Sequence, residues 1–137
     1  QSRAVKYAQF FKNNLKTQQD KYIWGLAAYS SGAVDIGHSN FDVFFAYHMY
    51  KRNLVFTHTD MIKFANTFAD IITTNGEVLH NAIDNTDINA SVSKAIFYWH
   101  IMSTINPTLK ERSLKYVANE KYPLKDLVTI GYSLFVK

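Results

Sequence analysis

The sequence predicts an all-α protein of antiparallel helical hairpins packed in two layers. Apolar residues recur every three to four positions in most segments of the 137-residue chain, which is the spacing of a buried helix face. Only two prolines and five glycines interrupt these segments. Amphipathic segments alternate with segments that are apolar on nearly every side, and helices of the second kind are buried all round. The apolar helices are therefore expected inside, and the amphipathic ones outside.

Six helices are expected along the chain. In order, they cover residues 3–17, 38–52, 58–74, 91–105, 107–119 and 123–137. The first is amphipathic, and the second is apolar on nearly every side. Thr57 and Asp60, a near-match to a capping box, mark the start of the third helix. Asn75-Gly76 marks its end, because both residues tolerate a left-handed backbone.

The last three predicted helices repeat this alternation. The fourth contains the apolar run AIFYWHIM, and Asn106-Pro107 supplies a cap followed by proline at the first position of the fifth. The fifth is amphipathic. The sixth, which begins at Pro123, is largely apolar.

Two long connections, residues 18–37 and 75–90, precede the first two inner helices. Loops of this length inside a compact domain are often functional. Consecutive helices are antiparallel in this arrangement, so all inner helices point the same way. Both long loops are then expected at one end of the molecule, over the N-termini of the inner helices, where anions are favoured.

Composition and charge argue against several classes of binding partner. The net charge is +4 and the pI is near 9.2, but the basic residues are scattered, so no nucleic-acid partner is expected. Without cysteine there is no disulfide or thiolate chemistry, and no apolar run is long enough to span a membrane. The stretch DNTDIN at 84–89 lacks the glycine and the glutamate of a calcium loop. No metal and no cofactor is predicted.

Polar residues at helical spacing interrupt the aromatic run that starts the first inner helix. His38 and Asp42 lie one turn apart on the same face. A buried carboxylate is costly unless it is paired, so the two are expected either to form a structural pair or to line a site. Asp35 either caps this helix or supplies a loop acid.

Further candidates lie in the two long loops. His80-Asn81 belongs to the second loop, at the same predicted end as His38, and is either a plain exposed segment or part of a site. Trp24 and Tyr29 belong to the first loop. Their rings either stack on sugars or fill the interior.

These residues form a pattern over about residues 20–120 that resembles the (α/α) toroids of polysaccharide lyases and six-hairpin glycosidases. The pattern consists of Trp24, the motif Asp35-x-x-His38-x-x-x-Asp42 with a capped outer helix after it, and the pair Tyr98-Trp99. A closed toroid needs many more hairpins than this chain holds. The resemblance therefore implies one helical domain, residues 1–137, that is a segment of a larger toroid completed by hairpins of the same or another chain.

The resemblance also implies a bacterial-type enzyme, secreted or periplasmic, that acts on an acidic polysaccharide. The expected reaction is β-elimination by a lyase on a uronate-containing glycan. In that chemistry Asn81 neutralises the uronate carboxylate, and His38 or His80 takes the C5 proton. Tyr29 or Tyr98 then protonates the leaving oxygen.

Other residues are expected to hold the substrate or to orient the catalytic groups. Asp35 would act as a general acid or hold a sugar hydroxyl, and Asp42 would fix the tautomer of His38. Trp24 and Tyr98 would contact the sugar. A hydrolase, the second choice among enzymes, needs a carboxylate opposite Asp35, and no matching loop acid is evident. The alternative is a non-catalytic helical module that binds glycan or packs against another protein.

Overall fold

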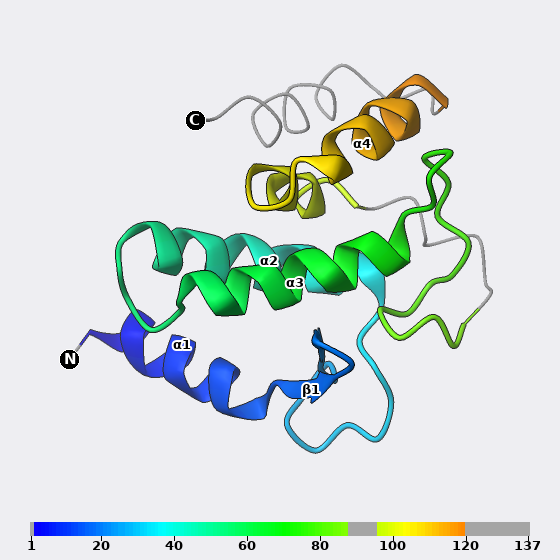
Figure 1. Ribbon diagram of the computed structural model, residues 1–137. Helices are drawn as coiled ribbons and strands as arrows, with labels where there is room; N and C mark the ends of the chain where they lie inside the picture. Colours follow the sequence, from blue (N-terminus) through cyan, green and yellow to red (C-terminus); the bar gives the residue numbers. More distant parts are fainter. Residues whose placement is uncertain (1, 88–95, 120–137) are drawn as a thin grey trace.

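The described residues form five helices and one two-stranded sheet. The structure is a computed structural model that describes residues 2–87 and 96–119 (Figure 1). In chain order, the elements are α1 (Arg3–Asn14), β1 (Lys16–Gln18), β2 (Lys21–Ile23), α2 (Ile36–Lys51), α3 (His58–Ile71), the 3₁₀-helix η1 (Trp99–Thr104) and α4 (Thr108–Asn119). Two predicted parts, 91–95 of the fourth helix and all of the sixth, 123–137, lie outside the described residues.

The predicted all-α class is wrong, because residues 16–23, predicted as the end of the first helix and the start of the first long connection, form a β-hairpin, and the domain mixes helices with a sheet. β1 pairs with β2 in antiparallel orientation, with Thr17 opposite Tyr22. The turn residues Gln19 and Asp20 have positive φ angles of 48° and 62°, as a type I′ turn requires. Such turns are usually marked by Asn-Gly or Asp-Gly, so Gln19-Asp20 gives no hairpin signal in the sequence.

The elements lie in three layers rather than two. Figure 1 shows α1 and the hairpin on one side of the antiparallel pair α2 and α3, with η1 and α4 on the other side. Helix α3 contacts both β2 and η1, and α4 packs on η1. Over residues 2–87 and 96–119 there is therefore no array of alternating inner and outer helices of the toroid kind.

Aromatic side chains join the three layers. The ring centroid of Trp24 lies 5.7 Å from that of Phe11 in α1 and 5.5 Å from that of Phe64 in α3. On the other side it lies 6.0 Å from Trp99 in η1. All of these rings are buried, and aromatic groups of this size dominate the energetics of a small core. Much of the aromatic content of the sequence therefore serves the core.

Helix α2 is not buried on every side, contrary to the sequence prediction. Phe41 is 66% exposed, whereas the polar residues Ser39 and Asn40 are buried. The indole N–H of Trp99 donates to Ser39 Oγ at 3.0 Å, and the backbone N–H of Tyr98 donates to Asn40 Oδ1 at 2.9 Å. These bonds satisfy two buried polar side chains and attach the start of η1 to α2.

The predicted fourth helix is a 3₁₀-helix where it is described. Residues 96–98 are not helical, and η1 covers only Trp99–Thr104. Its apolar run is short, and such a run predicts burial better than it predicts the type of backbone. The remaining helix predictions agree with α1, α2, α3 and α4 to within a few residues at each end.

The burial predictions are confirmed in part. Met49 and Ile101 are buried as expected, but Phe45 and Phe97 are half-buried. Of the residues expected to be exposed, Asp70, Lys110 and Lys115 are exposed. The fourth, Lys63, is half-buried, and its ammonium lies over the ring of Tyr22.

Asp60, at the start of α3, ties three elements together. The predicted capping box is confirmed, because Thr57 and Asp60 each accept the backbone N–H of the other. The same carboxylate accepts Lys12 Nζ of α1 at 2.7 Å and the Tyr22 hydroxyl of β2 at 2.5 Å. Burial raises the pKa of Asp60, but these hydrogen bonds outweigh burial and hold the pKa at about 2. The network fixes where α1 lies on the hairpin and α3.

Candidate functional site

The N-terminus of α2 carries a carboxylate–imidazole pair. Asp35 caps the helix, because its Oδ1 accepts the backbone N–H of His38 at 2.9 Å. Its Oδ2 lies 2.5 Å from His38 Nδ1, so the predicted hydrogen bond of His38 forms with Asp35. Burial raises the pKa of Asp35, but the hydrogen bonds with His38 bring it below its ordinary value. The His38 side chain is 66% exposed, so this Asp35–His38 pair faces solvent.

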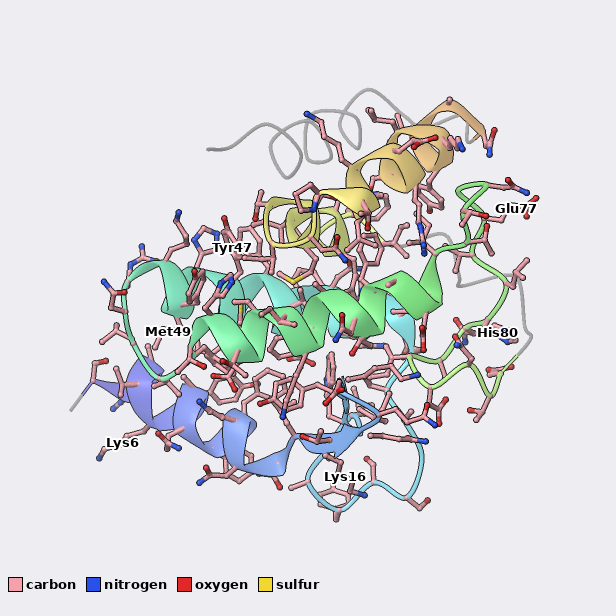
Figure 2. The ribbon with its side chains drawn as sticks, in the orientation of Figure 1. Lys6, Lys16, Tyr47, Met49, Glu77 and His80 are labelled. Carbon is pink, nitrogen blue, oxygen red and sulfur yellow. The ribbon has the colours of Figure 1, made fainter. Side chains whose placement is uncertain are left out.

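The second long loop reaches this pair, as predicted. The backbone N–H of Ile36 donates to the carbonyl oxygen of Asn81 at 2.7 Å, and Asp35 forms a β-bridge with Ala82. Figure 2 shows His80 at the same end of the molecule as the start of α2. The two long loops therefore converge beside the pair.

The side chains of His80 and Asn81 form no hydrogen bond with the Asp35–His38 pair. Asn81 Nδ2 donates to Asp87 Oδ2 at 3.3 Å. Asn81 Oδ1 and His80 Nδ1 are buried, and neither has a hydrogen-bond partner in the described part of the chain. What the fold brings to the Asp35–His38 pair is the backbone of the second loop.

Asp42 does not form a hydrogen bond with His38. Its Oδ2 instead accepts the indole N–H of Trp24 at 2.9 Å, which explains how a largely apolar helix accommodates this carboxylate. Burial raises the pKa of Asp42, and although the Trp24 hydrogen bond and the nearby His38 lower it, the pKa stays above its ordinary value. Trp24 is only 3% exposed, so of the two alternatives left open by the sequence its ring fills the interior.

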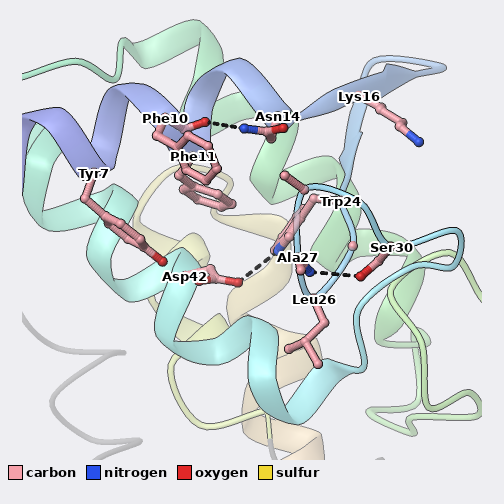
Figure 3. Close-up of a pocket in the computed structure, with 12 residues that line it drawn as sticks. Tyr7, Phe10, Phe11, Asn14, Lys16, Trp24, Leu26, Ala27, Ser30 and Asp42 are labelled. Carbon is pink, nitrogen blue, oxygen red and sulfur yellow. Dashed lines mark hydrogen bonds between the residues drawn. The ribbon is translucent and has the colours of Figure 1, made fainter.

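A pocket of about 90 Å³ opens between α1, residues 24–30 and the middle of α2 (Figure 3). Its lining includes Tyr7, Phe10, Phe11, Trp24, Leu26 and Asp42. Pockets for whole small molecules are typically about 300–1,000 Å³, so this one admits a single group of a larger ligand. Tyr7 and Phe10 are 54% and 57% exposed, and Leu26 is 66% exposed. Apolar surface at the mouth is therefore available to the rest of that ligand.

The charge inside the pocket is negative. Asp42 and Lys16 are the charged lining residues. Figure 3 shows the Tyr7 hydroxyl and the Trp24 indole N–H directed toward the Asp42 carboxylate, while the Lys16 ammonium points away from it. Burial, and then the charge of Asp42, raise the pKa of Tyr7, so this phenol stays neutral and is a hydrogen-bond donor.

The segment that forms one wall of the pocket is held by short-range hydrogen bonds. The backbone N–H of Val34 donates to the Trp24 carbonyl at 2.8 Å, and the N–H of Ala27 donates to Ser30 Oγ at 3.0 Å. This turn is tight at Gly25, where an added Cβ would lie 2.6 Å from the Cβ of Ser30. Only glycine fits this approach without displacing the wall.

The two predicted proton donors, Tyr29 and Tyr98, do not line the pocket and form no hydrogen bond with the Asp35–His38 pair. Tyr29 is 93% exposed and is not among the residues that line the pocket. Tyr98 is half-buried, and its ring lies 5.7 Å from Phe41 and 4.4 Å from Phe44 on α2. The predicted residues are thus divided between the α2 N-terminus, the pocket and two separate tyrosines.

Sequence reasoning missed the aromatic mouth of the pocket, formed by Tyr7 and Phe10. A signal was present, because these two aromatic residues are three positions apart in α1 and lie beside its apolar stripe rather than on it. Exposed apolar side chains that lie together in one patch are typical of binding surfaces.

No protein-family model, curated protein or solved structure matched this chain. Within residues 2–87 and 96–119, no helix is long and apolar enough to cross a membrane. The same residues contain no group of three or more His, Asp or Glu side chains placed to hold a metal ion. The fold and site thus define a small mixed α/β domain with a carboxylate-containing aromatic pocket, and its function is inferred from that pocket.

Proposed function

We propose that the chain is a non-catalytic module that binds a saccharide at the Asp42 pocket. The observation that supports this is the presence, at one place, of a half-buried carboxylate and the exposed rings of Tyr7 and Phe10. Ligand sites combine apolar and aromatic surface with a few polar groups that fix orientation. Sugar rings have both an apolar C–H face and hydroxyl groups that donate to a carboxylate.

The hydrogen bonding of Asp42 leaves room for a ligand. Its Oδ2 accepts the Trp24 N–H, and among the described residues no protein group donates to its Oδ1. A sugar hydroxyl that donates to this oxygen would form a charge-assisted hydrogen bond, which is stronger than a neutral one. The rest of the sugar ring would then lie over Tyr7 and Phe10.

The number of carboxyl groups in the pocket favours saccharide binding over hydrolysis. Hydrolysis of a glycosidic bond ordinarily uses two carboxyl groups, one on each side of the bond. Asp42 is the single acidic residue among those that line the pocket. One carboxylate beside exposed aromatic rings is sufficient for recognition.

The experiment is isothermal titration calorimetry with a panel of neutral, acidic and amino-sugar oligosaccharides. Tyr7→Ala and Phe10→Ala should each weaken the binding of the recognised oligosaccharide by about fivefold to tenfold, the usual contribution of an aromatic contact. Tyr29→Ala is the matched control, because Tyr29 is fully accessible but lies outside the pocket. Failure of every oligosaccharide to bind, or equal losses in all three variants, would reject the proposal.

A lyase acting on a uronate-containing, acidic polysaccharide is the second candidate, and the Asp35–His38 pair favours it. A carboxylate on Nδ1 leaves Nε2 as the nitrogen that takes the C5 proton. Asn81, in the adjoining loop, would neutralise the substrate carboxylate. Under this reading the protein works in a secreted or periplasmic setting, and further hairpins from the same or another chain complete the site.

Absorbance of the unsaturated product separates the two candidates. The chain is incubated with glucuronan, alginate or hyaluronan, alone and after substitution of His38→Gln. Product formation that disappears in His38→Gln would establish the lyase. Saccharide binding without new absorbance supports the binding module.

A further inference from the structure

The Asp42 pocket contains a negative charge with no cationic side chain to balance it. Within the described part of the chain, no Lys or Arg forms an ion pair with Asp42. Lys16, the basic residue of the lining, directs its ammonium away from the pocket in Figure 3. His38 acts on Asp42 only through space, because the His38 ring bonds to Asp35.

Such a carboxylate is costly in the free protein. Burial disfavours its charged form, and one indole N–H compensates only partly. A cation that entered the pocket would gain a charge-assisted hydrogen bond to a carboxylate that water solvates poorly. The negative charge of Asp42 would repel an anionic group.

Four aromatic rings line the same pocket as the carboxylate. Tyr7, Phe10, Phe11 and Trp24 all contribute to the lining. The faces of aromatic rings attract ammonium groups, and the attraction is strongest where water is excluded. Carboxylate and rings therefore favour the same kind of guest, a small organic cation.

We infer that the Asp42 pocket selects an amino sugar, with the protonated amine of a glycan unit bound between the Asp42 carboxylate and the aromatic lining. This inference rests on the proposed saccharide-binding function and names its ligand class. The volume of about 90 Å³ suits an ammonium substituent. The sugar ring that carries the amine lies at the mouth, against the exposed side chains of Tyr7 and Phe10.

The test compares two oligosaccharides that differ only at the amine. A chitosan tetramer has free amines, and a chitin tetramer of equal length has neutral N-acetyl groups. Calorimetry is performed at mildly acidic pH, where most of the free amines are protonated. The chitosan tetramer should bind about tenfold to a hundredfold more tightly, as expected for a hydrogen bond to a charged partner.

Asp42→Asn isolates the charge. The amide oxygen can still accept the Trp24 N–H, so the wall of the pocket is retained, and circular dichroism checks that the variant is folded. The preference for the chitosan tetramer should disappear in Asp42→Asn. Asp70→Asn, which removes the same charge from an exposed position on α3, is the matched control and should keep the preference.

The outcomes distinguish this inference from the function on which it rests. Equal binding of both tetramers to the wild-type chain, or an undiminished preference in Asp42→Asn, would overturn amine selection while leaving saccharide binding intact. If neither tetramer binds, methylammonium, a small cation that can donate N–H groups to Asp42, is titrated while the indole N–H resonance of Trp24 is followed. Saturable binding that Asp42→Asn abolishes would keep the cation pocket and reject the saccharide. Absence of that binding would reject both.

Discussion

Acidification is expected to destabilise this fold through His100. The side chain has no exposed surface, and neither ring nitrogen has a hydrogen-bond partner among the described residues. Phe68 and Tyr116 lie beside the ring at centroid distances of 5.7 and 5.5 Å. Burial lowers the pKa of His100 from 6.5 to about 3, because the imidazolium would lose its water without gaining an acceptor.

The magnitude follows from the two pKa values. The unfolded chain takes up the proton near pH 6.5, and the folded chain only near pH 3. The unfolded state therefore binds more protons between these values, so the stability is complete above pH 6.5 and falls as the pH drops. At about pH 5, roughly 1.5 units below the pKa of His100 in the unfolded chain, the free energy of unfolding is lower by about 2 kcal/mol.

Urea unfolding at about pH 7 and about pH 5 measures this loss. Wild type and His100→Leu are compared, because leucine keeps the site apolar and removes the titrating ring. The wild-type chain should lose about 2 kcal/mol more than His100→Leu between the two pH values. His58→Gln, at an exposed position, is the control and should behave as the wild type does.

Equal pH dependence in the wild type and in His100→Leu would refute the reasoning. Other titrating groups, such as the half-buried His48, are present in both proteins, so they cancel in the comparison. At neutral pH the Leu variant should be at least as stable as the wild type, because it removes two buried nitrogens that lack partners.

Three further predictions concern the Asp60 network, the pocket wall and the α2 cap. Asp60→Asn should lower the free energy of unfolding, measured in urea, by about 3 kcal/mol, because it breaks charged bonds to Lys12 and Tyr22. The Asp60 contribution should also be lost in the wild type as the pH falls from 3.8 through about 2, since the pKa is lower in the folded state. Gly25→Ala should displace the wall and weaken saccharide binding by calorimetry. Asp35→Ala should cost about 1 kcal/mol in thermal unfolding and leave pocket affinity unchanged.

Each of these has a contrary result. An Asp60→Asn protein as stable as the wild type would mean that the network does not hold α1 in place. Unchanged saccharide affinity in Gly25→Ala would indicate that residues 24–30 do not form part of the binding site. Loss of saccharide affinity in Asp35→Ala would indicate that the saccharide binds at the Asp35–His38 pair rather than at the Asp42 pocket.

Features set by neighbouring residues could be predicted from the sequence. The capping box at Thr57 and Asp60 and the cap at Asp35 each depend on residues three positions apart, so the sequence contains the whole interaction. The convergence of the two long loops followed from the direction of successive helices, and the bridge between Asp35 and Ala82 confirms it. These predictions needed no knowledge of distant contacts.

Features that depend on distant partners could not be predicted. Asp42 pairs with Trp24, 18 positions earlier, rather than with His38 one turn away, because Trp24 reaches α2 only after the hairpin has folded back. The hairpin itself depends on left-handed Gln19 and Asp20, which carry no conventional turn signal. The pocket therefore combines contacts that only the tertiary arrangement of α1, the 24–30 segment and α2 creates.

The most direct test of saccharide binding at this pocket follows the two indole N–H resonances by nuclear magnetic resonance during titration with a chitosan tetramer. Trp24 donates to Asp42 at the pocket, whereas Trp99 donates to Ser39 in the interior. The proposal predicts a saturable shift of the Trp24 resonance and a nearly stationary Trp99 resonance. A Trp24 resonance that stays still while those of the Asp35–His38 pair move, or no movement at all, would contradict it.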